Sequence, residues 1–344
     1  MVMHGLETLA KAIPTPVYRS LVRRDLYSFF YHVVSDEYLP HIHHLYPYKS
    51  SSQFEADLIY LRDHFHPVSY PQLNSRGKSQ GDVEPGSVLL SFDDGCAECY
   101  SVVRPRLLKY AIPCVFFITT SLIDNQSMLY RHKASLCIER ITSAEEGWRQ
   151  AKFTQIGQAF SREILDVPSF IRWLKMDKTG EAGVIEPVSQ MLEIDLEQYL
   201  SERRPYLTRD EICSLAEDGF TIGAHSVSHA KLSSLTPAGL EAEIAGSCQV
   251  IQEITGQEQV PFAFPFSAYG ADRRLLAEIA VRHPEIGMLF DSKGIREEKG
   301  LLLNRIWADP VGKQAGQTNI PQLLRSAYED NFVWKTRQLR LNIR

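Results

Sequence analysis

Two pairs of side chains that could bind a metal or transfer protons each follow a short apolar run. Asp93 and Asp94 come directly after the run VLLSF at 88–92, and the next residue is a glycine. Two adjacent carboxylates resist joint ionisation unless a cation or another partner compensates for their charge. A metal ion bound to one carboxylate would leave the other free to accept a proton. Because Asp-Gly is also common in ordinary turns, this pair alone is compatible with either a turn or a site.

The second pair consists of His225 and His229, which follow the run FTIGA at 220–224. Two imidazoles four residues apart can converge on one ion if the turn between them is helical. Such a spacing also arises by chance in a chain with 11 histidines, so its position after an apolar run is the informative feature. One carboxylate and two imidazoles would leave coordination positions open for water and substrate.

The elements that must position these side chains are short apolar runs separated by helical periodicities. The chain has 344 residues, of which 44% are hydrophobic and 23% charged, as is usual for a folded protein with a large core. β-Branched and aromatic residues predict buried strands at 26–34, 88–92, 115–119, 220–224, 262–266, 286–291 and 301–306. Helices are predicted between them, one opened by a capping box at 208–211 and another spanning 237–256. This alternation predicts an α/β fold with a mostly parallel sheet or barrel.

The region at about 125–202 interrupts the alternation. It is rich in Glu, Lys and Gln with isolated aromatic residues, and it contains no clear strand. We predict a mainly helical insertion there. A C-terminal helical extension is predicted at about 318–344, with its basic end exposed to solvent. The whole chain, 1–344, is expected to form a single domain with these two additions.

Charge and composition exclude several classes of function. The 37 basic and 42 acidic residues give a net charge of −5, so an overall basic field for nucleic acid or anionic membranes is absent. No apolar run approaches the ~20 residues needed to span a bilayer. The segment 1–17 lacks a continuous apolar signal region, so a cytoplasmic protein is expected. Of the six cysteines only Cys96 and Cys99 are close, and no second pair completes a zinc knuckle, so free buried thiols are expected.

The order of three motifs resembles the polysaccharide deacetylases, or NodB-homology domains, of carbohydrate esterase family 4. The motifs are FDDG at 92–95, HSVSH at 225–229 with its helix–strand lead-in, and FAFPFSAYG at 262–270. The resemblance runs from about residue 30 to 306 without the inserted region. It implies a distorted, incomplete (β/α) barrel acting on an N-acetylated or O-acetylated sugar. By the same resemblance, Asp93 is the catalytic base and a backbone N–H near Phe266 holds the oxyanion. The resemblance also implies that a divalent metal, usually zinc, is bound by Asp94, His225 and His229.

The chain departs from the family pattern in its third motif. The arginine that normally orients the base is replaced by Ala263, within an aromatic-Pro-aromatic version found in a branch involved in exopolysaccharide biosynthesis. Arg305, at a neighbouring strand end, is the candidate substitute, and a purely structural arginine is the alternative. Asp291, at the end of another predicted strand, is expected to contact the acid or the substrate.

The late Leu-x-His segment that supplies the general acid is also absent after Leu301. Some relatives in the same branch are circularly permuted and carry this histidine in an N-terminal strand, which Tyr31-His32 resembles. His32 is therefore the candidate general acid, and a buried histidine bonded to a carbonyl is the alternative. A cluster of three histidines is expected to lie in a loop: His41, His43 and His44. Four further histidines receive no role: His64, His66, His132 and His283.

These expectations combine into a metal-dependent hydrolase that releases acetate and leaves a free amino sugar. His32 would protonate the leaving amine, because an amide nitrogen does not leave unprotonated. Two alternatives remain open: a deacetylase-like domain that binds carbohydrate without turnover, and an amidohydrolase acting on a small non-sugar amide. A pocket closed to oligosaccharides would favour the small amide, whereas an open groove lined by aromatic residues would favour a glycan.

Overall fold

The computed structural model describes residues 10–22, 24–74, 83–176, 182–298, 302–309 and 318–341. Its strands form one sheet in the order β8-β7-β6-β5-β4-β3-β1-β9, with β2 paired beside β3, and every pairing is parallel. The strands are β1 (Leu26–Tyr31), β2 (His66–Pro67), β3 (Ser87–Phe92), β4 (Cys114–Ile118), β5 (Thr221–Ala224), β6 (Val260–Ala263), β7 (Ile286–Asp291), β8 (Leu302–Asn304) and β9 (Ile306–Trp307).

The two edges of this sheet are formed by strands that are almost adjacent in the sequence. β8 pairs with β7 at one edge and β9 pairs with β1 at the other, yet only Arg305 separates them in the chain. The chain therefore steps from one edge to the other at this residue, which we call the seam. The sheet is a nearly closed parallel barrel, which confirms the predicted distorted, incomplete (β/α) fold.

The predicted strands correspond closely to those in the structure. All six residues of β3 and all five of β4 are buried, so each strand reads as a continuous apolar run. The run 301–306 differs, because it contains the seam and is divided into β8 and β9.

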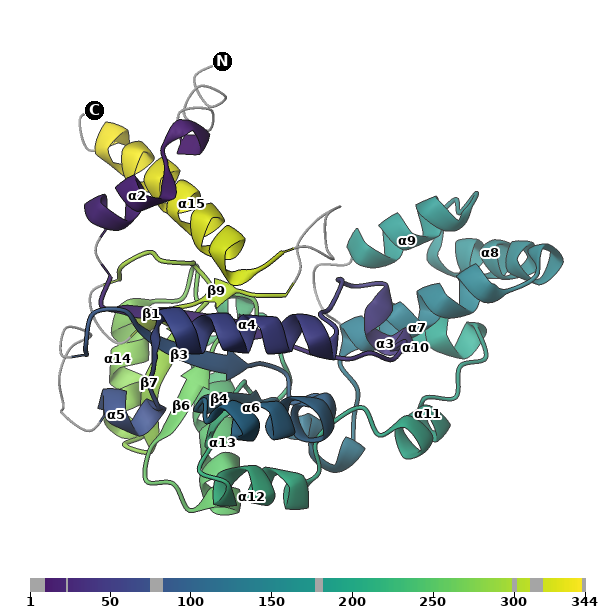
Figure 1. Ribbon diagram of the computed structural model, residues 1–344. Helices are drawn as coiled ribbons and strands as arrows, with labels where there is room; N and C mark the ends of the chain where they lie inside the picture. Colours follow the sequence, from purple (N-terminus) through teal and green to yellow (C-terminus); the bar gives the residue numbers. More distant parts are fainter. Residues whose placement is uncertain are drawn as a thin grey trace.

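Helices cover the outside of the barrel (Figure 1). They are α2 (Thr15–Leu21), α3 (Pro40–His43), α4 (Ser51–His64), α5 (Tyr70–Asn74), α6 (Arg104–Tyr110), α12 (Arg209–Glu217), α13 (Pro237–Thr255), α14 (Arg273–Arg282) and α15 (Ile320–Leu341), with a π turn, η1 (Cys99–Val103), and two 3₁₀ helices, η2 (Thr120–Asn125) and η3 (Leu232–Ser234). α12 begins with the predicted capping box: Thr208 accepts from the backbone of Glu211, whose side chain accepts from the backbone of Thr208. No helix in the described ranges is long and apolar enough to cross a membrane.

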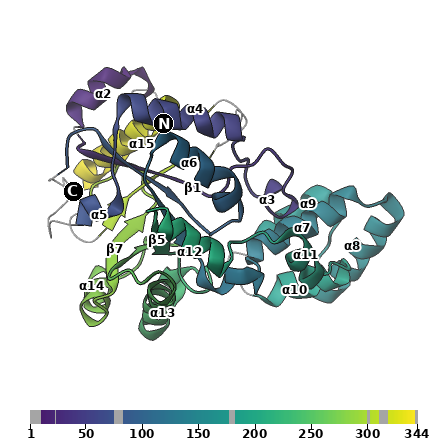
Figure 2. The ribbon, with the colours of Figure 1, turned by 60° about the horizontal axis from the view of Figure 1, so that its bottom comes forward.

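The region between β4 and β5 forms a group of helices at one side of the barrel (Figures 1 and 2). They are α7 (Tyr130–Ser143), α8 (Glu146–Phe160), α9 (Val167–Met176), α10 (Ala182–Met191) and α11 (Leu196–Arg203), where the sequence predicts a helical insertion at about 125–202. These helices bury an apolar cluster of their own, which includes Ile138, Phe153, Phe170 and Val188. The insertion is thus held together by its own core, and the start of α7 reaches back to the barrel.

The C-terminal extension is the long helix α15. It lies against α2 (Figure 1). The rings of Tyr18 in α2 and Tyr328 in α15 stack with centroids 5.8 Å apart. Tyr328 also bonds through its hydroxyl to Tyr27 of β1. The helix is therefore fastened to the strand beside the seam.

Candidate active site

Because the strands are parallel, the loops at their carboxyl ends meet on one face, the place where α/β barrels hold their chemistry. A pocket of about 220 Å³ opens there. The residues that line it include every predicted metal ligand, base and acid: Phe30, His32, Leu45, Tyr46, Asp93, Asp94, Leu129, Tyr130, Arg131, His132, His225, His229, Phe264, Phe266, Ser292, Arg305 and Trp307. The sequence positions that bring this set together span nearly 280 residues, from β1 to β9.

The structure brings the three predicted metal ligands together. Asp94 Oδ1 lies 3.4 Å from His225 Nε2 and 3.2 Å from His229 Nε2. All three residues are buried, and within the described ranges they form the one group of His, Cys, Asp and Glu side chains able to share an ion. The histidines converge although the turn that joins them is not helical. Ser226 and His229 are in the left-handed region (φ 66° and 59°), and the Ser226 hydroxyl accepts from the His229 backbone at 2.9 Å.

The chemistry of these donors fits a divalent metal. His225 Nδ1 lies 2.9 Å from the carbonyl oxygen of Ala263, which can only accept, so Nδ1 carries the proton and Nε2 has a free lone pair. Asp94 Oδ1 is buried without a hydrogen-bond donor. Burial alone would raise the pKa of Asp94, but the two histidines hold it well below its usual range. Two imidazole nitrogens and one carboxylate oxygen match a catalytic zinc site with an open position.

Asp93 is held by Arg305 in a bidentate ion pair. The guanidinium donates to Asp93 Oδ1 at 2.6 Å and Oδ2 at 2.8 Å, and also to the Ser91 hydroxyl at 3.0 Å. Its plane lies against the rings of Phe30 and Phe117, at 4.4 and 4.9 Å from their centroids. Burial raises the pKa of Asp93, but Arg305, His225 and His32 together outweigh burial, so this pKa is lowered. Arg305 thus pairs with Asp93 from the seam, whereas Ala263 has no side chain that could do so.

His32 is paired with a carboxylate that the sequence motifs did not indicate. Its Nδ1 lies 2.6 Å from Asp309 Oδ2, and Asp309 also accepts from the His32 backbone at 3.1 Å and from Trp307 Nε1 at 2.7 Å. Burial lowers the pKa of His32, yet the hydrogen bond and charge of Asp309 outweigh it and raise the pKa to about 9. His32 therefore lies in the pocket bonded to a carboxylate, which favours its protonated form, and not to a carbonyl. Asp309 follows β9, so its place after a strand end is the signal that could have found it.

The other two predicted residues have different environments. Phe266 lines the pocket in the left-handed region (φ 60°), and no acceptor for its backbone N–H is found among the described residues. Asp291 is expected to contact the acid or the substrate, and among the described residues its hydrogen bonds do not go to His32. Asp291 is the last residue of β7, and its carboxylate accepts from the backbones of Ala268 at 2.9 Å and Ser292 at 2.7 Å, which fixes the loop after Phe266.

The remaining histidines and cysteines are placed as follows. His41 and His43 form α3 and not a loop, and His41 bonds to Tyr199 of the insertion. The six cysteines are free, and all but Cys213 are buried. His132, given no role from the sequence, lines the pocket.

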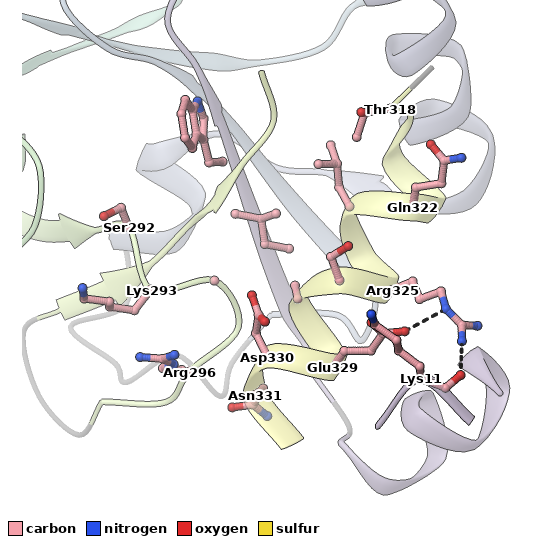
Figure 3. Close-up of a pocket in the computed structure, with 16 residues that line it drawn as sticks. Lys11, Ser292, Lys293, Arg296, Thr318, Gln322, Arg325, Glu329, Asp330 and Asn331 are labelled. Carbon is pink, nitrogen blue, oxygen red and sulfur yellow. Dashed lines mark hydrogen bonds and ion pairs between the residues drawn. The ribbon is translucent and has the colours of Figure 1, made fainter. Parts of the chain in front are cut away.

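A larger cavity of about 960 Å³ adjoins the pocket (Figure 3). The two share Ser292 and Trp307 as walls. Figure 3 shows Ser292 and Arg296 on one side of this cavity and Asp330 of α15 on the other. Asn331, also in its lining, is 1% exposed, and among the described residues its amide has no hydrogen-bond partner. The walls of the cavity are otherwise largely polar and charged.

Together, fold and site define a nearly closed parallel barrel with an Asp-His-His centre at the carboxyl ends of its strands. The sequence profile of the family described as "Polysaccharide deacetylase" matches residues 178–281, a stretch that holds both histidine ligands. This match confirms the resemblance to the polysaccharide deacetylases, a family of enzymes, over that stretch of the chain. No curated protein sequence matches the chain.

Solved structures share the fold at low sequence identity. The deacetylase PplD from Streptococcus pyogenes is 15% identical, with a TM-score of 0.53 over 89% of this chain and 99% of its own. IcaB from Ammonifex degensii is 14% identical, with a TM-score of 0.51 over 90% and 97%. A de-N-acetylase from Aggregatibacter actinomycetemcomitans is 15% identical, with a TM-score of 0.51 over 87% and 99%.

Proposed function

We propose that this protein is a metal-dependent hydrolase that removes acetyl groups from an N-acetylated sugar or polysaccharide. One observation carries the proposal. A buried carboxylate held by an arginine (Asp93) and a carboxylate-paired, protonated histidine (His32) line the same pocket as the Asp-His-His group. A proton acceptor, a proton donor and a candidate metal centre together match the needs of amide hydrolysis.

Asp94, His225 and His229 would hold a divalent ion, with zinc preferred for this donor set. When bound, such an ion would polarise the acyl oxygen and make a water molecule more acidic. Asp93 would accept the proton of the attacking water. Because Arg305 engages both oxygens of Asp93, the carboxylate keeps one orientation and stays ionised at neutral pH.

The leaving nitrogen needs a proton, which His32 would donate. Asp309 holds the ring by Nδ1, so the Nε2–H group is the one left to face the pocket. The free backbone N–H of Phe266 would donate to the acyl oxygen as negative charge develops there. Asp291 supports this step indirectly by fixing the loop that follows Phe266.

The adjoining cavity favours a glycan over a small amide. The small pocket is bounded by aromatic rings, including Tyr46 and Trp307, and Trp307 also lines the larger cavity. A chain of sugar units could extend from one space into the other, whereas a small amide would leave the larger one unused. The reading as a non-catalytic carbohydrate-binding domain rested on a missing arginine and a missing late histidine. Arg305 beside Asp93 and His32 in the pocket are candidates for those groups, which supports turnover over binding alone.

The test is acetate release from N-acetylated chito-oligosaccharides and from simple acetamides, with metal content measured on the same sample. Release from the oligosaccharides with a divalent ion present is expected. Turnover restricted to small acetamides would replace the proposal with the amidohydrolase alternative. A cytoplasmic location also remains our prediction, and cell fractionation would check it.

A further inference from the structure

The wall that the helical insertion contributes to the pocket carries a histidine that the mechanism above does not use. Residues 129–132, at the start of α7, all line the pocket, and His132 among them is 1% exposed. In the described ranges, the group able to share a metal ion does not include His132. Its function must therefore be something other than metal binding.

The hydrogen bonds around Tyr206 fix the tautomer of His132. The backbone N–H of Leu129 donates to the Tyr206 hydroxyl at 3.1 Å, and His132 Nδ1 lies 2.7 Å from the same oxygen. Tyr206 is 1% exposed, and its own proton has no other acceptor in the described part of the chain. A buried hydroxyl left without an acceptor is costly, so Tyr206 donates to Nδ1. The proton of the neutral His132 ring then resides on Nε2.

The Nε2–H group of His132 is the ring's remaining polar group, and the described residues offer it no acceptor. The ring cannot easily turn away, because it is bonded to Tyr206 and packs against His41 with ring centroids 5.2 Å apart. Burial lowers the pKa of His132 to about 4, which keeps the ring neutral at physiological pH. The pocket thus contains two histidines of opposite character: His32 is a cation, and His132 is a fixed neutral donor.

We propose that His132 is a positioning residue whose Nε2–H group donates a hydrogen bond to an oxygen of the bound sugar, so that the helical insertion takes part in substrate selection. This inference rests on the proposed function, because it takes the substrate to be an N-acetylated sugar. His132 takes no part in proton transfer in this scheme. Its contribution is to hold the sugar in register with Asp93 and His32.

The first experiment measures binding without turnover. In an Asp93→Asn background loaded with zinc, calorimetry would follow the binding of N-acetyl chitotetraose. His132→Leu should raise the Kd on the order of tenfold, the value of one hydrogen bond. His132→Gln, whose amide can replace the donor, should recover most of that loss. His66→Leu, at an exposed histidine outside both cavities, is the matched control and should bind as the parent does.

Two further measurements separate positioning from a merely structural role. In the metal-free protein, ¹⁵N spectra should show a neutral Nε2–H tautomer for a histidine signal that disappears in His132→Gln, and Tyr206→Phe should alter that tautomer. In turnover assays, His132→Leu should act mainly on KM for the tetrasaccharide, with a much smaller loss on 4-nitrophenyl acetate, which carries no sugar.

The outcomes distinguish this inference from the function it rests on. Acetate release by the parent protein, with no change of Kd or KM in His132→Leu, would overturn the inference and leave the proposed function standing. An Nδ1–H tautomer for His132 would do the same. So would equal losses of activity in His132→Leu on the tetrasaccharide and on the ester. Tetrasaccharide binding that depends on His132, without acetate release by the parent protein, would sustain the inference and overturn the proposed function.

Discussion

Asp309 holds the His32 ring at 2.6 Å while accepting from the backbone of the same residue at 3.1 Å. This double contact joins the end of β1 to the end of β9. Its consequence is electrostatic, because the buried carboxylate favours the protonated form of the imidazole. The pKa of His32 is raised from its ordinary value of 6.5 to about 9.

The first prediction is a direct titration of His32 in the metal-free protein. NMR should find one histidine with a pKa of about 9, and Asp309→Asn should lower that value because the favourable charge is removed. Since the folded pKa exceeds the ordinary value of 6.5, the contact stabilises the fold fully below about pH 6.5, and the contribution is lost as pH rises through 9. A His32 signal that titrates at its ordinary value in both proteins would contradict the pairing.

The second prediction concerns the leaving group. His32→Ala should lose ~10²–10⁴-fold in rate on N-acetyl substrates, because their nitrogen must be protonated to leave. The loss on an activated acetyl ester should be far smaller, since its leaving group needs little protonation. Parallel assays on the two substrates check this, and equal losses would leave the general acid unassigned.

The third prediction separates the two adjacent carboxylates. Asp94→Ala should lose both bound metal and activity, whereas Asp93→Asn should retain metal and lose most turnover, because it removes a proton acceptor and not a ligand. Metal analysis and acetate release on the same preparations would decide. If Asp93→Asn lost metal while Asp94→Asn kept it, the two roles would be reversed.

The fourth prediction concerns the buried pair of Asp93 and Arg305. Arg305→Met should lower the free energy of unfolding by ~3–5 kcal/mol, because it leaves a buried carboxylate without its partner. In an Asp93→Asn background the same change should cost much less, and denaturant unfolding of the four proteins measures the difference. Arg305→Lys should restore charge but not the two parallel bonds, so activity should recover less than stability. Equal losses in both backgrounds would show that Arg305 contributes through its ring contacts alone.

The strands and the metal ligands were accessible to sequence reasoning because their signals are local. A strand buried on both faces is a continuous apolar run, as in β3 and β4, and its carboxyl end predicts where polar ligands gather. The candidate ligands Asp94, His225 and His229 lie within five residues of such ends. The helical insertion was recognisable for the opposite reason, because such runs are missing from it.

The parts that sequence reasoning missed depend on contacts between distant segments. Asp309 is 277 positions from His32, and the tautomer of His132 depends on Tyr206, 74 positions away. The turn between the two candidate histidine ligands is not helical, and Glu243 of α13 accepts from the backbones of Val227 and Ser228 in it, both at 2.9 Å. Spacing along the chain contains none of this information.

The candidate metal ligands and the partners of Asp93 and His32 come from two different parts of the barrel. The candidate metal ligands follow β3 and β5 in the interior of the sheet, whereas Arg305 and Asp309 belong to the short segment that joins its two edges. A barrel opened along the seam would keep its ion-binding side chains but release Asp93 and His32 from the partners that set their protonation. Proton transfer would then depend on closure of the sheet, so that a partly folded molecule could bind an ion without being active.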